Sequence, residues 1–201
     1  MKRMDAILNY PDLTINEIQD LIKQSKPHID FSNLITPYSG NKEWEESCRT
    51  KMWWGREYTG PVEDKCKPTL ALKQLLLAQG GCEACLPAIE EDLAQIISHG
   101  QLWDNLTTKR MKGRPCQCHA NAGELWYNNK DSWQTKGFAV IICTGYALSA
   151  DGFWKQHSWL IQAKPRANVL IETTEPRIAY YGFGMPYKMA EEFESENWGW
   201  W

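Results

Sequence analysis

Residues 137–161 read GFAVIICTGYALSADGFWKQHSWLI, and this stretch decides the fold. Two runs rich in aromatic and β-branched residues flank Asp151-Gly152, a dipeptide typical of tight turns. The stretch therefore predicts an antiparallel hairpin. Because side chains alternate between the two faces of a strand, the second run places His157 and Trp159 together on one face.

A third strand is predicted over residues 168–174, NVLIETT, and it carries Glu172. If His157 pairs directly with Glu172 across an antiparallel turn, that turn must centre between Lys164 and Pro165, where the turn-forming residues lie. Direct pairing would leave the two Cβ atoms roughly 4.5–5.5 Å apart. A glutamate at that distance could accept a hydrogen bond from the imidazole and fix its tautomer.

Upstream of the hairpin, Cys118 falls near the expected start of a helix. Pro115 disfavours a helix before it, and the alanine, glutamate and leucine residues that follow favour one after it. Unpaired amides and the positive end of the helix dipole stabilise a thiolate there. Cys118, His157 and Glu172 are therefore predicted to be a nucleophile, its base and the residue that orients the base. Cys116 is the nearest competitor for the role of nucleophile.

Residues beside the predicted nucleophile and base are candidates for supporting roles. Side-chain amides at the helix start could donate to an oxyanion, although such residues more often cap a helix or lie on the surface. Neighbours on a helix do not face each other, so the histidine after the nucleophile is expected to support the site rather than catalyse. The candidates are Gln117 and Asn121 as oxyanion donors, with Trp159 and His119 in supporting positions.

The pattern of motifs resembles the core of the transglutaminase-like superfamily within the papain-like fold. Members typically show a cysteine at a helix start, an H-[AS]-W strand and a D-x-T strand, and this chain offers Cys118, HSW at 157–159 and ETT at 172–174. The resemblance covers about residues 114–183, and Glu172 stands where members carry Asp. It implies an α+β fold in which the helix bearing the nucleophile packs on an antiparallel sheet.

The same resemblance implies a function. Relatives include transamidases, proteases, deamidases and acyltransferases. The resemblance therefore indicates the mechanism better than it indicates the substrate. We expect a thiolate at Cys118 to attack the amide of a protein or peptide-like substrate and form an acyl-enzyme without a cofactor. Amide hydrolysis, by a peptidase or deamidase, is expected ahead of transamidation because water is the default acceptor.

A metal site is the alternative for the cysteines. Cys82 and Cys85 form a C-x2-C pair, and Cys116, Cys118 and His119 could supply the further ligands of a zinc site, with Cys66 upstream. Against this, the second group is C-x-C-H rather than another C-x2-C. A zinc-stabilised chain would be a non-catalytic interaction module that uses its tryptophan-rich surface.

Each residue of the predicted triad also has an ordinary interpretation. Cys118 could be a half-buried thiol, because cysteine is among the most buried residue types. His157 could be a core or surface histidine, and Glu172 a solvated carboxylate on a strand. The C-x2-C pair could likewise be two ordinary thiols after a helix that Gly80-Gly81 ends, and a redox dithiol is a third interpretation of the pair.

Length and composition set outer limits. The chain has 201 residues, 43% of them hydrophobic and 23% charged, which suits one domain over 1–201 with a mainly helical extension (1–100) before the core (101–201). A formal net charge of −3 argues against a nucleic-acid partner. No apolar run approaches the length of a membrane span, and seven cysteines without a signal peptide predict a cytoplasmic protein.

The first half is predicted to be helical. A capping box at residues 14–17 should begin one amphipathic helix, which a Lys-Pro step ends, and two more are predicted over 68–79 and 87–99, each stopped by glycine. Residues 30–66 are expected to be mostly loop. The aromatic residues of 198–201 are expected to dock on the domain or on a partner, because they would be costly to leave in water.

Overall fold

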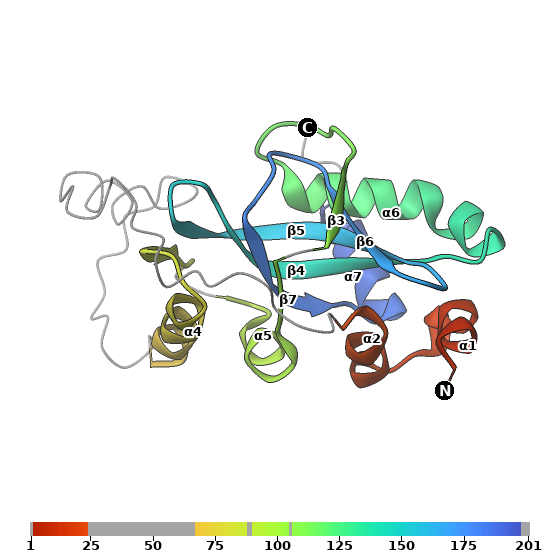
Figure 1. Cartoon of the computed structure of the whole chain (residues 1–201), viewed down its shortest axis with the longest axis horizontal. Helices are drawn as coiled ribbons and strands as arrows, with labels where there is room; N and C mark the ends of the chain where they lie inside the picture. Colours follow the sequence, from red (N-terminus) through yellow and green to blue (C-terminus); the bar gives the residue numbers. More distant parts are fainter. Residues whose placement is uncertain (1, 24–66, 88–89, 105, 198–201) are drawn as a thin grey trace.

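The structure is a computed structural model, and it describes four stretches of the chain: residues 2–23, 67–87, 90–104 and 106–197. Within these stretches the protein is a mixed α+β fold with a curled, largely antiparallel sheet flanked by helices (Figure 1). The α+β prediction is therefore confirmed. Among the described helices, none combines the length and the apolar character needed to cross a membrane.

Seven described strands form one sheet. The parallel pairs are β3 with β6 and β1 with β5, and the other neighbours are antiparallel. The predicted hairpin is confirmed as β4 and β5. The order along the sheet is β2 (Gln101–Trp103), β7 (Ala179–Gly184), β4 (Ala139–Leu148), β5 (Phe153–Ala163), β6 (Asn168–Glu172) and β3 (Thr107–Arg110), with β1 (Glu83–Cys85) beside β5.

The register between β5 and β6 differs from the prediction. Leu160 is opposite Ile171, so the pairing is offset by two residues from the one that would place His157 opposite Glu172. The prediction that His157 and Glu172 lie directly opposite each other is therefore wrong. Because side chains alternate with a period of two, an offset of two leaves both side chains on the face predicted for them.

Both faces of the central hairpin are buried, which explains the near-continuous apolar sequence of β4. Alternate residues of β4 and β5 enter two separate apolar clusters. One face packs against α6 (Cys118–Thr135), and its cluster includes Val140, Ile142, Leu160 and Trp126. The other packs against α1 (Arg3–Leu8) and α2 (Ile15–Ile22), and its cluster includes Ile141, Trp159, Ile161, Ile7 and Ile18.

The helices of the first half agree with the sequence only in part. The capping box of α2 is present, since the backbone N–H of Thr14 donates to Glu17 Oε2 at 3.0 Å. The helix predicted over 68–79 is α4 (Lys67–Ala78). The prediction over 87–99 is wrong at its start, because α5 spans Leu93–His99. Just before α5, the carboxylate of Glu90 is bound by Tyr146 and Gln156 of the sheet, which ties that segment to β4 and β5.

Several elements were not predicted from the sequence. They are α1, β1, β2, β3, β7, a 3-10 helix (Tyr10–Asp12) and α7 (Tyr187–Asn197). α7 packs on α6, where the rings of Tyr187 and Trp126 lie 5.1 Å apart. The expectations for residues 30–66, for 198–201, for the Lys-Pro step and for Cys66 lie outside the described residues.

Candidate active site

The chain reaches Cys118 along the outer strands of the sheet. β3 runs parallel to β6, and beyond β3 the backbone N–H groups of Met111 and Gly113 donate to the carbonyls of Glu172 and Thr173 at 2.8 and 2.7 Å. This segment therefore extends past the end of β6 before it turns into α6. Cys118 is the first residue of α6, as predicted.

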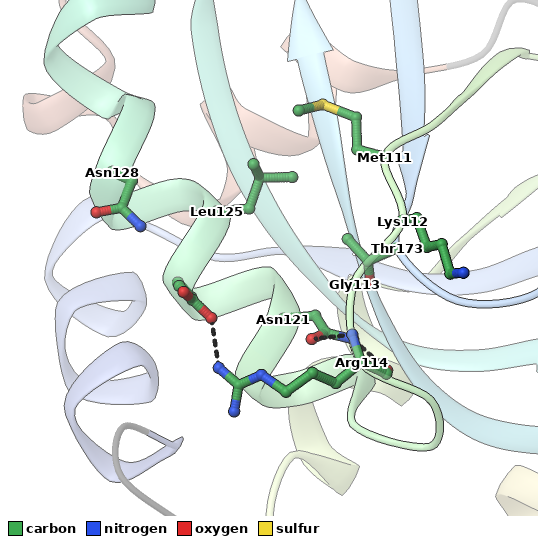
Figure 2. Close-up of a pocket in the computed structure, with 9 residues that line it drawn as sticks. Met111, Lys112, Gly113, Arg114, Asn121, Leu125, Asn128 and Thr173 are labelled. Carbon is green, nitrogen blue, oxygen red and sulfur yellow. Dashed lines mark hydrogen bonds and ion pairs between the residues drawn. The ribbon is translucent and has the colours of Figure 1, made fainter.

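A buried asparagine closes the turn before the helix. The carboxamide of Asn121 accepts from the backbone N–H of Arg114 at 2.9 Å and donates to the carbonyl of the same residue at 2.7 Å (Figure 2). The Arg114 side chain in turn pairs with Glu124 at 2.6 Å. Asn121 therefore fixes the turn that precedes the thiol, and the geometry gives it this role in place of the predicted oxyanion donor.

The sulfur of Cys118 lies at an interruption in the pairing of β5. One edge of β5 pairs with β4, and the other pairs with β1 at Phe153–Lys155 and with β6 at Leu160–Ala163. No described strand pairs with residues 156–159 on that second edge. The backbone N–H of Ser158, within this interval, donates to the sulfur of Cys118. The sheet edge thus presents an amide to the Cys118 sulfur where a further strand would otherwise pair.

The predicted base and orienter are in direct contact. His157 Nε2 lies 2.9 Å from Glu172 Oε2, and the two side chains are 3% and 0% exposed. The carboxylate also accepts from Tyr180 Oη at 2.8 Å and from the backbone N–H and hydroxyl of Thr174 at 2.7 and 2.9 Å. Burial raises the pKa of Glu172, but the charge and hydrogen bond of His157 and the other donors outweigh it, so this pKa is lowered.

The thiol and the imidazole shift each other's protonation. Burial raises the pKa of Cys118, but the hydrogen bond and charge of His157 and the amides of Ser158 and His119 outweigh burial and lower it. Burial lowers the pKa of His157, whereas its contacts with Cys118 and Glu172 raise the pKa to about 9. Both directions favour a thiolate–imidazolium pair. Since Nε2 faces Glu172, Nδ1 is the ring nitrogen left for the sulfur.

His119 has a different role from His157. Its Nδ1 lies 2.6 Å from Ser158 Oγ, and its ring packs edge-on against Phe193 with centroids 5.8 Å apart. Burial, and next the charge of His157, lower the pKa of His119 to about 4, so the ring stays neutral near pH 7. His119 therefore contacts the residue whose amide contacts the sulfur, and its supporting role stays a prediction.

Aromatic rings pack against His157. The ring of Trp159 is nearly parallel to that of His157, with centroids 6.3 Å apart, and Tyr180 lies 5.1 Å from Trp159. These rings exclude water from one side of the His157–Glu172 contact. Trp159 thus lies beside His157, and its supporting role stays a prediction. Tyr180 was missed, because it comes from β7, whose pairing with β4 has no local signal in the sequence.

A cavity of about 620 Å³ lies beside the start of α6. Figure 2 shows it between the segment 111–114 and α6, with Leu125 and Asn128 on the helix side and Thr173 on the sheet side. The cavity follows the face of α6 that begins at Cys118, because residues 3, 7 and 10 positions further along a helix share a face.

Among the described residues, the structure does not bring the predicted zinc ligands together. Cys82 and Cys85 lie at β1, Cys116 is exposed in the turn before α6, and His119 contacts Ser158. Within the described stretches, no group of three histidine, cysteine, aspartate or glutamate side chains is placed to hold a metal ion. Cys143 is buried in β4, and burial raises its pKa well above the ordinary value.

Comparison of the chain with family models, with curated proteins and with solved structures found no match. The chemistry that the site can perform therefore follows from its own geometry. That geometry has a partly exposed thiol at a helix start, a buried imidazole in contact with it, and a buried carboxylate that orients the imidazole.

Proposed function

We propose that this protein is a cysteine-dependent hydrolase or acyl transferase that acts on amides, with a transglutaminase-like arrangement of Cys118, His157 and Glu172. The observation that carries the proposal is the buried 2.9 Å contact between His157 Nε2 and Glu172 Oε2, with the other side of the ring directed to a thiol of lowered pKa. A carboxylate that orients an imidazole toward a thiol is the arrangement used for covalent catalysis. A protein or peptide-like amide is the proposed substrate.

The proposed reaction begins with the thiolate of Cys118. Its sulfur forms a bond to the amide carbonyl carbon, and the carbonyl oxygen becomes an oxyanion. The imidazolium of His157 then donates its proton to the leaving nitrogen, the C–N bond breaks, and an acyl-enzyme and a free amine remain. His157, now neutral, takes a proton from water as the water oxygen attacks the thioester. The C–S bond breaks, the acid is released and the thiolate returns.

The start of α6 offers donors for the oxyanion. The first helical hydrogen bond runs from Asn121 N to Gln117 O at 2.9 Å, so the backbone N–H of Cys118 itself has no acceptor within the helix. An oxyanion formed on a carbonyl bound to the sulfur would lie near this amide. Gln117 is exposed at the helix N-cap and stays a predicted second donor.

Hydrolysis is proposed ahead of transamidation. The thiol is partly exposed, whereas His157 and Glu172 are buried, so solvent approaches the site from the side of the sulfur. Water at that position can give a proton to the neutral ring of His157 and attack the thioester without any further binding site. An amine acceptor would need its own contacts to compete with water.

The proposal is tested by the rate at which iodoacetamide alkylates each cysteine across a pH series, read by mass spectrometry of the intact chain and its peptides. Cys118 should react faster than the other cysteines and with a midpoint below the ordinary value of about 8.5. His157→Ala should move that midpoint upward. Equal rates at several cysteines, or a fast Cys116 beside a slow Cys118, would contradict the proposal.

Stability and metal content separate catalysis from a zinc-dependent fold. Cys118→Ala should abolish alkylation at this site while leaving the melting temperature nearly unchanged, because a partly exposed thiol adds little packing. If Cys118 were instead a structural zinc ligand, the same substitution would release zinc and lower the melting temperature sharply. Melting curves and bound zinc should be measured on the full chain, with Cys143→Ala as the matched case of a buried thiol.

A further inference from the structure

A second thiol lies two residues before the nucleophile, and it is exposed. Cys116 has φ of 57°, in the left-handed region that residues other than glycine rarely adopt. Its neighbours are fixed on both sides, because Asn121 binds the backbone of Arg114 and Cys118 begins α6. Cys116 therefore occupies a defined turn rather than a loose loop.

Covalent geometry keeps the two thiols within reach of each other. Residues two positions apart have Cα atoms at most about 7 Å apart. Gln117 between them has φ −124° and ψ 47°, which is short of full extension. The separation thus falls within the roughly 4.4–6.8 Å that a disulfide spans. The other described cysteines come from β4 and from the region of β1, so Cys116 is the described thiol next to Cys118 along the chain.

We propose that Cys116 and Cys118 form a site of reversible oxidation by hydroperoxides, with Cys118 as the thiol that is attacked and Cys116 as the thiol that resolves it. A deprotonated, accessible cysteine beside a second thiol is the usual arrangement of a redox-sensitive pair. Here the helix start and His157 favour the deprotonated form of Cys118. The exposed turn before α6 presents Cys116 as the second thiol.

The oxidation takes place in two balanced steps. The thiolate of Cys118 attacks the terminal oxygen of a hydroperoxide, the O–O bond breaks, and Cys118 becomes a sulfenic acid while the peroxide leaves as an alcohol or water. The thiol of Cys116 then attacks the sulfenyl sulfur, an S–S bond forms, and water leaves. Overall two thiols lose two hydrogen atoms and the hydroperoxide is reduced.

The disulfide has a consequence for the proposed reaction. With its sulfur bonded to Cys116, Cys118 cannot attack an amide, and exchange with a dithiol restores it. Without Cys116, excess peroxide would carry Cys118 on to the sulfinic acid, which a dithiol does not reduce. This inference rests on the proposed reactivity of Cys118.

The test treats the full chain with hydrogen peroxide and maps the products. Trypsin cleaves after Lys112 and Lys130 but not between Arg114 and Pro115, so Cys116 and Cys118 share one peptide, 113–130. Cys82 and Cys85 fall in a different peptide, 74–109. The variants are Cys116→Ser, which removes only the resolving thiol, and the double variant Cys82→Ser with Cys85→Ser as the matched control.

The parent chain and the control should lose two hydrogen atoms in peptide 113–130, and dithiothreitol should restore alkylation of Cys118. Cys116→Ser should instead gain two oxygen atoms at Cys118, and dithiothreitol should not restore its alkylation. Gain of oxygen by the parent at the rate of Cys116→Ser, or a disulfide found only in 74–109, would overturn the inference. If Cys118 reacts with iodoacetamide yet forms no disulfide, the inference fails and the triad stands. If Cys118 reacts with neither reagent, both fail.

Discussion

The side chain of Glu172 fits a diagonal contact. With β5 and β6 offset by two residues, Glu172 lies diagonally from His157, and such positions on neighbouring strands are separated by roughly 7–8 Å at the backbone. A glutamate is one methylene longer than the aspartate found in the resembling family, and its carboxylate reaches Nε2 at 2.9 Å. The longer acid and the shifted register therefore compensate for each other.

The charge of Glu172 should be needed to keep the imidazole protonated. Glu172→Gln retains the shape of the side chain but removes the charge, so the pKa of His157 should fall and that of Cys118 should rise. We expect alkylation of Cys118 at pH 7 to slow by about tenfold, the change that one pKa unit represents. The pH profile of alkylation measures this, with the exposed Glu175→Gln as control. An unchanged profile in Glu172→Gln would show that the acid does not tune the site.

Tyr180 should stabilise the same carboxylate. Tyr180→Phe removes the hydroxyl that donates to Glu172 Oε2 at 2.8 Å and leaves the ring packing in place. A hydrogen bond to a charged group contributes about 1.5–3 kcal/mol, so the free energy of unfolding should fall by this amount. Urea denaturation measures the loss, and Tyr127→Phe, on an exposed tyrosine, should have little effect. Equal losses in the two variants would rule out the specific role.

At the scale of elements, the helices and strands that could be predicted are those with a clear local pattern in the sequence. β4, β5 and α6 carry long apolar or helix-favouring runs, and the sequence predicted all three. β3 has the sequence TTKR and is fully exposed, so it shows no apolar alternation from which a strand could be predicted. It is a strand because it pairs with β6. The β5–β6 register was missed because the turn between Ala163 and Asn168 tolerates a shift of two, which leaves every side chain on its face.

The turn before α6 should depend on Asn121. Asn121→Ala removes both hydrogen bonds to the part-buried backbone of Arg114, and the loss of such bonds costs about 1–3 kcal/mol. The start of α6 should then lose its fixed position, and alkylation of Cys118 should become slower and less dependent on pH. Asn128→Ala, on the same face of α6 but exposed, is the matched control. The role fails if both variants unfold at the same urea concentration.

At the scale of the whole molecule, the half-buried His119 next to Cys118 should make the fold sensitive to acid. The pKa of His119 is about 4 in the folded chain, against an ordinary 6.5. Its contribution to stability is therefore present above pH 6.5 and is lost as the pH falls toward 4, because the unfolded chain takes up the proton first. Asp92 acts in the opposite direction, since burial raises its pKa to about 6 and its contribution is lost as the pH rises through that value.

His119→Asn isolates this contribution. Asparagine can place an amide nitrogen near Ser158 Oγ but does not titrate, and Asp92 is unchanged between the two chains. The loss of unfolding free energy between pH 6.5 and pH 4.5 should be smaller in His119→Asn than in the parent. Urea denaturation at a series of pH values measures the difference. Parallel pH profiles for the two chains would exclude His119 as the source.

The interruption in β5 has a consequence for how the chain behaves when it is damaged. An unpaired strand edge is a template on which other chains can add strands and aggregate. Over residues 156–159 the described structure places the first turn of α6, rather than a strand, at that edge, with the sulfur accepting from Ser158. Any substitution or chemical damage that displaces this turn would expose an unpaired, aggregation-prone strand edge in the middle of the sheet. Displacement of Cys118 from this edge should therefore be accompanied by self-association of the chain.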